Sequence, residues 1–279
     1  MKPRQSFRRQ LVSAWEASGS LVCVGLDPLV EQLPEGVAPT PAGCLAFCRA
    51  IVDAVAGHVC AFKPQAAHFA ALGGENELAA LIAYIHERHP DIPVILDAKR
   101  GDIGSTAALY AREAYVRYDA DAVTVNPFLG PEGLTPFLAY ESRGVVVLCR
   151  TSNPDSAWLQ ESTDETGTPA FLRIAQAAND WSPGGNVMLV AGATYPDELR
   201  AIRRAAPGVP LLVPGIGAQG GSVDAVVDAG LDASGAGLVV NASRSVIHAS
   251  RGSDFARAAR GAVDALNAQI AHARRHRRS

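Results

Sequence analysis

The chain has 279 residues, a length that suits either two ordinary domains or one larger domain such as an α/β barrel. Hydrophobic residues make up 48% and charged residues 19% of the sequence, so the chain can bury a large core and is too sparsely charged for a disordered or nucleic-acid-coating protein. The net charge of −3 gives no sign of a polyanion-binding surface. The basic run at the C-terminus is expected to be a short disordered tail over about 272–279.

The cysteines and the hydropathy indicate where the protein works. An odd number of cysteines, 5 in all, lies mostly within apolar segments, as expected for small hydrophobic side chains in a reducing cytoplasm. Cys44 and Cys48 have a C-x3-C spacing, but no second pair follows, so we predict no metal site there. No apolar stretch is long enough to cross a membrane, and the N-terminus lacks the apolar core of a signal peptide. We expect a soluble cytoplasmic protein that binds neither membrane nor nucleic acid.

Along the chain, short apolar segments alternate with amphipathic ones. Helices are predicted at 5–18 (closed by Gly19), 41–57 (after Thr40, closed by Gly57), 75–88, 105–118, 135–140, 169–181, 196–206, 221–229 and 254–270. Strands are predicted at 21–27, 58–63, 121–126, 144–151, 186–194, 209–215 and 236–243, with one more at 92–96 that leads into Asp97 and Lys99. The polar, turn-rich segment 152–168 is predicted to be a long loop.

The pattern of elements predicts the fold. Strands that are apolar at nearly every position are typical of a parallel sheet covered by helices on both faces. Eight successive strand–helix units in a chain of 279 residues, with no linker between them, predict a single (β/α)8 TIM barrel over 1–279, preceded by the N-terminal helix at about 5–18. A doubly wound open sheet is the alternative.

The segment DAKRGDIGST, at 97–106, is the first candidate site. An apolar strand ends there on Asp97, Lys99 and Asp102. Since side chains alternate along a strand, Ile95, Asp97 and Lys99 are expected on one side and Ala98 on the other. The same residues would also fit a surface ion pair at a strand end.

The other predicted strands decide between a functional site and a surface ion pair, because in a barrel the carboxyl ends of all strands meet at one mouth, where active sites lie. Polar side chains follow those ends: Asp27, Lys63, Asn126, Arg150, Thr151, Thr194, and the segments PGIGAQGG at 214–221 and NASR at 241–244. Charges gathered at one end of apolar strands need partners, so Lys63 and Asp27 are expected to converge on Asp97 and Lys99. The prediction is therefore an active site.

A glycine loop follows the seventh predicted strand. Gly215, Gly217 and Gly220 match G-x-G-x-x-G, but a dinucleotide-binding fingerprint would open the first strand–helix unit instead. In a barrel the loops after the seventh and eighth strands commonly bind phosphate. Arg244, just after the last strand, could clamp the same anion. We therefore predict a phosphate site there.

At this point the residues resemble those of a known family. D-x-K-x-x-D-I-x-x-T, filled by Asp97, Lys99, Asp102, Ile103 and Thr106, resembles the signature of the orotidine 5′-phosphate decarboxylases. Further matching segments are GLDP at 25–28, FKPQ at 62–65, TVNPFLG at 124–130, TSNP at 151–154, PGIGAQGG and NASR. The length and TSNP are similar to the longer bacterial branch. The resemblance implies decarboxylation of orotidine 5′-monophosphate (OMP) to UMP in pyrimidine synthesis, without metal or organic cofactor.

The resemblance also implies a charge network. Lys99 would protonate C6 after carbon dioxide leaves, and Asp97 would lie against the substrate carboxylate. Lys63 would lie near Asp97 and the ribose. Asp102 and Thr106 would reach across the interface of a homodimer into the neighbouring subunit's site. Opposite charges around a lysine favour its charged form, which a proton donor needs.

Other residues would hold the substrate itself. By the same resemblance, Asp27 would bind the ribose hydroxyls and Ser152 the pyrimidine. The remaining residues expected at the substrate, most of them at the phosphate, are Ile103, Pro214, Gly215, Gly217, Gln219 and Arg244.

Two alternative functions remain. A Mg²⁺-dependent sugar-phosphate decarboxylase or lyase on the same barrel would use Asp27, Asp97 and Asp102 as ligands, although Lys63 would compete with the metal as a cation. A non-catalytic nucleotide-binding barrel is the other. Four clustered charges argue against it, because unrelieved buried charges are costly.

Overall fold

Eight parallel strands form a single sheet in the computed structural model, which describes residues 5–181, 184–216 and 220–277. The strands are β1 Val22–Leu26, β2 Ala61–Pro64, β3 Ile95–Arg100, β4 Ala122–Val125, β5 Gly144–Arg150, β6 Val187–Ala191, β7 Leu211–Pro214 and β8 Leu238–Ala242. Their order is β2-β1-β8-β7-β6-β5-β4-β3. Two isolated parallel bridges, Phe62 to Val94 and Gln65 to Asp97, join the two edge strands. The sheet therefore nearly closes, which confirms the (β/α)8 barrel and rules out the doubly wound sheet.

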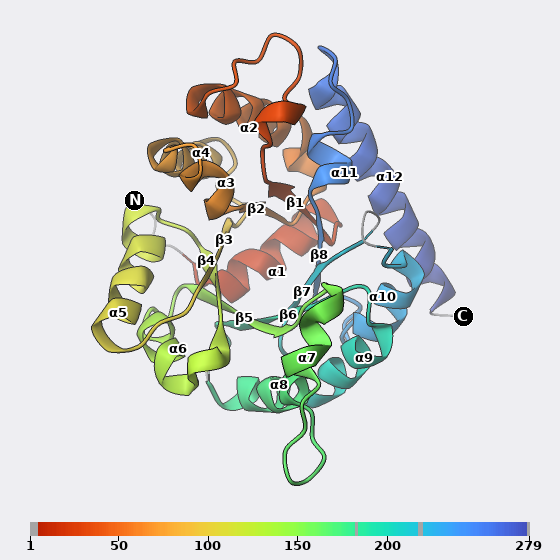
Figure 1. Ribbon diagram of the computed structural model, residues 1–279. Helices are drawn as coiled ribbons and strands as arrows, with labels where there is room; N and C mark the ends of the chain where they lie inside the picture. The colour runs from red at the N-terminus through yellow and green to blue at the C-terminus, as the bar shows by residue number, and fades with distance from the viewer. Residues whose placement is uncertain (1–4, 182–183, 217–219, 278–279) are drawn as a thin grey trace.

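Helices surround the ring of strands (Figure 1). They are α1 Phe7–Ser18, α2 Pro41–Val55, α3 Ala66–Ala70, α4 Glu75–Arg88, α5 Gly104–Arg112, α6 Pro131–Leu138, α7 Ala157–Gln160, α8 Ala170–Trp181, α9 Pro196–Ala205, α10 Val223–Gly230, α11 Arg244–Ile247 and α12 Phe255–His276. Short 3-10 turns are η1 Val30–Gln32, η2 Ala56–His58, η4 Pro127–Leu129 and η5 Pro154–Ser156, and η3 Glu113–Arg117 is a π-helix. None of the helices in the described ranges is long and apolar enough to cross a membrane.

Several helix ends follow the predicted local chemistry. The hydroxyl of Thr40 accepts a hydrogen bond from the backbone N–H of Gly43 at 3.2 Å, and Pro41 takes the first turn of α2. Gly19 ends α1 with a left-handed φ of 64°. The bounds of α4 are those predicted, and its buried side chains, Leu78, Leu81, Ile82 and Ile85, lie on one face.

The N-terminal helix α1 lies behind the strands in Figure 1. Phe7, Leu11 and Trp15 are buried, and the backbone N–H of Phe7 donates to the carbonyl of Ser142, just before β5. This helix therefore covers the amino-terminal end of the barrel and leaves the carboxyl ends of the strands open. Every residue of β1, β4, β6 and β8 is buried, and all of these residues except Thr124 and Asn241 are non-polar.

Some predicted boundaries were wrong. Gly57 does not close α2, which ends at Val55 and continues into the turn η2. The helix predicted at 105–118 gives way at Glu113 to a π-helix. The helix predicted at 135–140 begins earlier, at Pro131, a residue that suits a first helical turn.

Two segments predicted to be irregular contain helix. The predicted loop 152–168 contains η5 and α7. The tail predicted at about 272–279 is helical as far as His276, because Ile270 and Ala273 continue the buried stripe of α12. Arg274 also donates to the carbonyl of Gly235 at 2.7 Å. The last two residues, 278–279, lie outside the described residues.

Candidate active site

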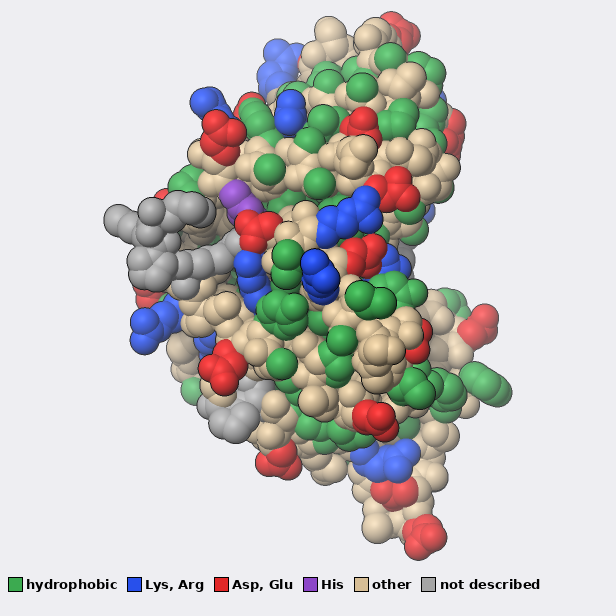
Figure 2. Space-filling view, turned by 90° about the vertical axis from the view of Figure 1, so that its left-hand side faces the viewer, with side chains coloured by type: hydrophobic (Ala, Val, Ile, Leu, Met, Phe, Trp, Pro, Cys, Tyr) green, Lys and Arg blue, Asp and Glu red, His purple; other side chains and the backbone are tan. Residues whose placement is uncertain are grey.

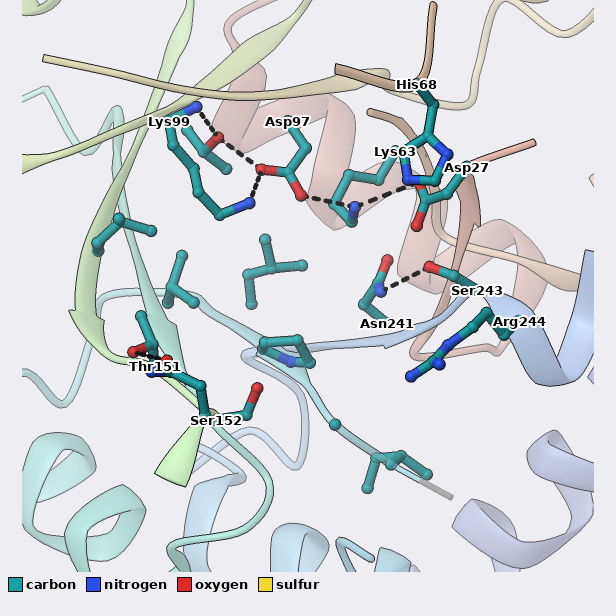
Figure 3. A pocket seen from close by; sticks show the side chains of 18 of the residues that line it. Asp27, Lys63, His68, Asp97, Lys99, Thr151, Ser152, Asn241, Ser243 and Arg244 are labelled. Carbon is teal, nitrogen blue, oxygen red and sulfur yellow. Dashed lines mark hydrogen bonds and ion pairs between the residues drawn. The ribbon is translucent and has the colours of Figure 1, made fainter. Parts of the chain in front are cut away.

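A cavity of about 600 Å³ opens at the carboxyl ends of the strands. This volume is within the range of about 300–1,000 Å³ that is usual for small-molecule sites. The predicted site residues that line it are Asp27, Lys63, Asp97, Lys99, Ser152, Pro214, Gly215 and Arg244. Figure 3 shows most of them pointing into the same space.

Three of these side chains form a continuous chain of charge (Figure 3). The ammonium Nζ of Lys63 lies 2.8 Å from Oδ2 of Asp97, and Nζ of Lys99 lies 2.7 Å from Oδ1 of the same carboxylate. Lys63 Nζ is also 3.8 Å from Oδ1 of Asp27. β1, β2 and β3 thus bring together residues that are far apart in the sequence. A surface ion pair does not describe this arrangement, because Lys63 and Asp97 are only 4% and 7% exposed.

Electrostatics keep the buried pair charged. Burial alone would lower the pKa of Lys63, but the carboxylates of Asp27 and Asp97 outweigh it and raise that pKa above its ordinary 10.5. Burial alone would raise the pKa of Asp97, yet Lys63 and Lys99 together hold it well below its ordinary 3.8. At neutral pH the site therefore holds a buried ammonium and a buried carboxylate, with the ammonium of the half-exposed Lys99 beside them.

Two acceptor oxygens at the cavity lack hydrogen-bond donors. Oδ1 of Asp27 and Oδ1 of Asn241 are both buried, and neither has a hydrogen-bond partner among the described residues. The amide nitrogen of Asn241 donates instead to Ser243 at 3.3 Å. A buried acceptor without a donor is unfavourable, so both oxygens suit a ligand that brings hydroxyl or N–H groups.

Ser152 is packed against Gly192, the residue that follows the neighbouring strand β6. A Cβ on Gly192 would lie 2.8 Å from Cα of Ser152, so a larger residue there would displace this segment. The hydroxyl of Thr194 donates to the carbonyl of Ser152 at 3.2 Å. The chain after β5 is therefore packed tightly against the chain after β6.

The predicted phosphate loop is described in part. Gly215 has a φ of 101°, a conformation that favours glycine, and its carbonyl accepts from the backbone N–H of Gly221 at 3.1 Å. Gly217 and Gln219 lie outside the described residues. Arg244 extends toward the cavity (Figure 3) and forms no ion pair with any described residue. Its guanidinium is therefore available to an anion.

Three predicted residues do not line the cavity of this chain. Asp102 and Ile103 lie between β3 and α5, and Thr106 lies in the first turn of α5. The side chain of Asp102 accepts from the backbone N–H of Ile103 at 2.8 Å. Within one chain the charge network therefore comprises Asp27, Lys63, Asp97 and Lys99, without Asp102.

Other polar strand-end residues have structural contacts. Arg150 is 1% exposed, bonds to Ser156 and Glu161, and lies 3.7 Å from the ring centroid of Tyr195. Asn126 accepts from the backbone N–H of Phe128 at the start of η4.

Sequence reasoning did not single out several residues at the cavity, among them His68, Thr124 and Gln160, and it placed Asn241 and Ser243 at the mouth only as part of the segment NASR. Thr124 could have been found, since it is a single polar residue within an otherwise apolar strand. Gln160 could not, because only the fold of 152–168 brings it back to the site.

The Mg²⁺ alternative requires a cluster of oxygen ligands, and the described part of the chain contains no group of three or more His, Cys, Asp and Glu side chains placed to hold an ion. The ammonium of Lys63 lies between the carboxylates of Asp27 and Asp97, where a bridging cation would otherwise bind. This geometry disfavours the ligand set of the Mg²⁺ alternative.

The fold and the site define a (β/α)8-barrel enzyme with a lysine–carboxylate network beside a candidate phosphate loop. Residues 20–259 match the model of the orotidine 5′-phosphate decarboxylase / HUMPS family, and the chain belongs to this family.

Several proteins named orotidine 5′-phosphate decarboxylase are similar to this chain. The chain is 51% identical to an orotidine 5′-phosphate decarboxylase of Ralstonia nicotianae over 265 residues, which cover 95% of this chain and 97% of the relative. It is 52% identical to one from Cupriavidus necator over 256 residues, or 91% and 94% of the two chains. The solved structure of Leishmania donovani OMP decarboxylase is 37% identical, with a TM-score of 0.84 over 97% of this chain and 99% of that one.

Proposed function

We propose that this protein is an orotidine 5′-phosphate decarboxylase that converts OMP to UMP and carbon dioxide, with Lys99 as the proton donor. The observation that carries the proposal is the chain Lys63–Asp97–Lys99, which holds an ammonium 2.7 Å from a buried carboxylate at the open end of the barrel. The family match, and the relatives that align over nearly the whole chain, support the same reaction.

The substrate would span the cavity from the charge network to the glycine loop. Arg244 and the backbone at Gly215 would bind the phosphate, with Gln219 and Gly217 expected beside them. Oδ1 of Asp27 is buried and accepts no hydrogen bond from the described residues, which supports its assignment to the ribose hydroxyls. The pyrimidine would lie between Lys99 and Ser152, on opposite sides of the cavity in Figure 3.

The charges then favour loss of carbon dioxide. The bond from C6 to the carboxylate breaks, its electron pair stays on C6, and the ammonium of Lys99 gives that carbon a proton. UMP results, and the neutral amine takes a proton from water. A fixed ammonium stabilises the developing carbanion far more than water does. Asp97 would lie against the substrate carboxylate. Repulsion between the two negative charges would raise the free energy of the bound substrate more than that of the transition state, in which carbon dioxide is leaving.

One ion contact does not account for such a reaction. Enzymes lower barriers by up to ~23 kcal/mol in common cases, more than one ammonium supplies. Binding of the phosphate at the far end of the cavity would hold the pyrimidine in place and so contribute to the rate.

A homodimer with shared sites is part of the proposal. Large apolar side chains after β3 and β4 are 46–71% exposed, namely Ile103, Leu109, Val116, Phe128 and Leu129. Figure 2 views the side that carries α5, where hydrophobic side chains lie among charged ones. A partner subunit that covers this face would bury these apolar side chains. It would also bring Asp102 and Thr106 of this chain near the cavity of the partner subunit.

A cytoplasmic location remains the expectation. All five cysteines are free and buried, which suits a reducing compartment.

The test is direct. Purified protein, incubated with OMP, should abolish the orotate ultraviolet absorbance while UMP appears stoichiometrically. Activity should be unaffected by EDTA, and loss of activity on chelation with recovery on adding Mg²⁺ would favour the metal-dependent alternative. A Lys99→Ala variant that retains full activity would refute the assigned proton donor.

A further inference from the structure

Thr124, in β4, touches the charge network from the side. It is 1% exposed and lines the cavity. Its hydroxyl oxygen Oγ1 lies 2.9 Å from Oδ1 of Asp97, 2.9 Å from the backbone N of Lys99 and 3.0 Å from the backbone N of Ala98. One hydroxyl therefore makes three hydrogen bonds within the site.

The directions of these bonds follow from the groups involved. Backbone N–H groups only donate, so Oγ1 accepts from Ala98 and from Lys99, which occupies both of its lone pairs. Its single proton is left for Asp97, whose ionised carboxylate only accepts. Oδ1 of Asp97 then has two donors, the hydroxyl and the ammonium of Lys99, while Oδ2 has Lys63.

These bonds close a ring around Lys99. Its backbone N–H binds Thr124, the hydroxyl of Thr124 binds Asp97, and Asp97 binds the ammonium at the end of the same lysine side chain. The hydroxyl–carboxylate pair thus holds both ends of Lys99. Without these hydrogen bonds the Lys99 side chain could adopt many rotamers, because it is 48% exposed and a lysine side chain is flexible.

The backbone of Lys99 needs the same hold. Lys99 has a φ of 47°, in the left-handed region that is unfavourable for residues other than glycine. The pairing of β3 with β4 shifts register between Leu96 and Arg100, so the ladder does not stabilise this conformation. The hydrogen bonds from the backbone N–H groups of Ala98 and Lys99 to Thr124 replace the strand-to-strand hydrogen bonds that are missing here.

We infer that Thr124 is a positioning residue that fixes the proton-donating ammonium of Lys99 relative to C6 of the substrate. The inference rests on the proposed function. A general acid that can swing away from its target loses rate while the substrate still binds, so the effect belongs in kcat rather than in binding.

The experiment replaces the hydroxyl and keeps the shape. Thr124→Val removes the hydroxyl, Thr124→Ser retains it, and Thr135→Val removes an exposed threonine hydroxyl in α6 as the matched control. Decarboxylation of OMP gives kcat and KM. Exchange of the C6 hydrogen of UMP in D2O, followed by NMR, reports the proton transfer alone, and a titration gives the affinity for UMP.

We expect Thr124→Val to lower kcat and the exchange rate together by roughly 10- to 100-fold, the size of a lost hydrogen bond to a charged group, with UMP affinity within about 3-fold. Thr124→Ser should stay within about 3-fold of the wild type in both rates, and Thr135→Val should equal it. A purely structural role would lower thermal stability and leave both rates of the folded enzyme unchanged.

Contrary results are equally specific. A folded Thr124→Val variant with kcat within about 2-fold of the wild type, or a Thr124→Ser variant as slow as Thr124→Val, would overturn the inference. If Thr124→Val does not fold, Thr124→Cys, with a weak donor of similar size, decides: intermediate rates support the role and wild-type rates overturn it. A wild-type protein that neither decarboxylates OMP nor exchanges UMP would instead refute the proposed function, and the role of Thr124 with it.

Discussion

The side chain of Gln160, at the end of α7, is folded back onto Thr151, the residue that follows β5. Its Oε1 accepts from the backbone N–H of Thr151 at 2.8 Å, and its Nε2 donates to the hydroxyl of Thr151 at 2.9 Å. Both residues line the cavity next to Ser152. The segment predicted as a loop is thus a short helical support for the chain that would contact the pyrimidine.

Removing this support should weaken substrate binding. We expect Gln160→Ala to raise KM for OMP about 3- to 30-fold, because two hydrogen bonds that hold the Thr151–Ser152 segment are lost, and to change kcat less. Gln176→Ala, an exposed position on α8, is the control. Steady-state kinetics on both variants check this, and an unchanged KM for Gln160→Ala would show that the segment holds its shape without Gln160.

Loss of the Asp97 carboxylate should destabilise the fold in a pH-dependent way. Asp97→Asn leaves the buried ammonium of Lys63 with only Asp27, at 3.8 Å, so we expect the free energy of unfolding to fall by about 3 kcal/mol at neutral pH. The pKa of Asp97 is lowered in the folded state, so its contribution is present above its ordinary 3.8 and is lost as the pH falls below that value.

Denaturant unfolding of the wild type and of Asp97→Asn between pH 7 and acid checks this sign. The difference between them should stay constant down to about pH 4 and shrink below it. A difference that grows on acidification would mean that the carboxylate is not the charged partner of Lys63.

Arg244 should act on the phosphate alone. We expect Arg244→Ala to raise KM for OMP roughly 10- to 100-fold, as a charge-assisted contact is lost. Turnover of orotidine, which lacks the phosphate, should be the same in the variant and the wild type. Arg257→Ala, which removes an 84% exposed arginine, serves as control. Equal losses with OMP and orotidine would place Arg244 elsewhere in the mechanism.

Shared sites can be tested by mixing two inactive variants. Lys99→Ala and Asp102→Asn should each be nearly inactive if Asp102 completes the partner's site. Co-refolding equal amounts should restore roughly a quarter of wild-type activity, since random pairing makes half of the dimers mixed and each mixed dimer has one intact site. Activity of the mixture equal to the mean of the two parents would argue that each chain works alone.

Much of this protein could be read from local sequence. The spacing of apolar residues that marks a strand or an amphipathic helix involves only residues close together in the chain. The barrel and the bounds of α4 could therefore be predicted from this spacing. The site residues at strand ends could be read too, because parallel strands of a barrel all end at one mouth. For this reason Asp27, Lys63, Asp97 and Lys99 were expected together, and they line one cavity.

Contacts between separate strand–helix units could not be read in this way. Thr124 lies 27 residues from Asp97, and their contact depends on the register of β4 against β3 and on an irregularity at Lys99. Arg150 ends a strand like Lys63 yet is turned toward α7, away from the charge network. Which neighbour a polar side chain meets is set by barrel closure and packing, and these involve residues too distant in the chain for any local pattern to encode.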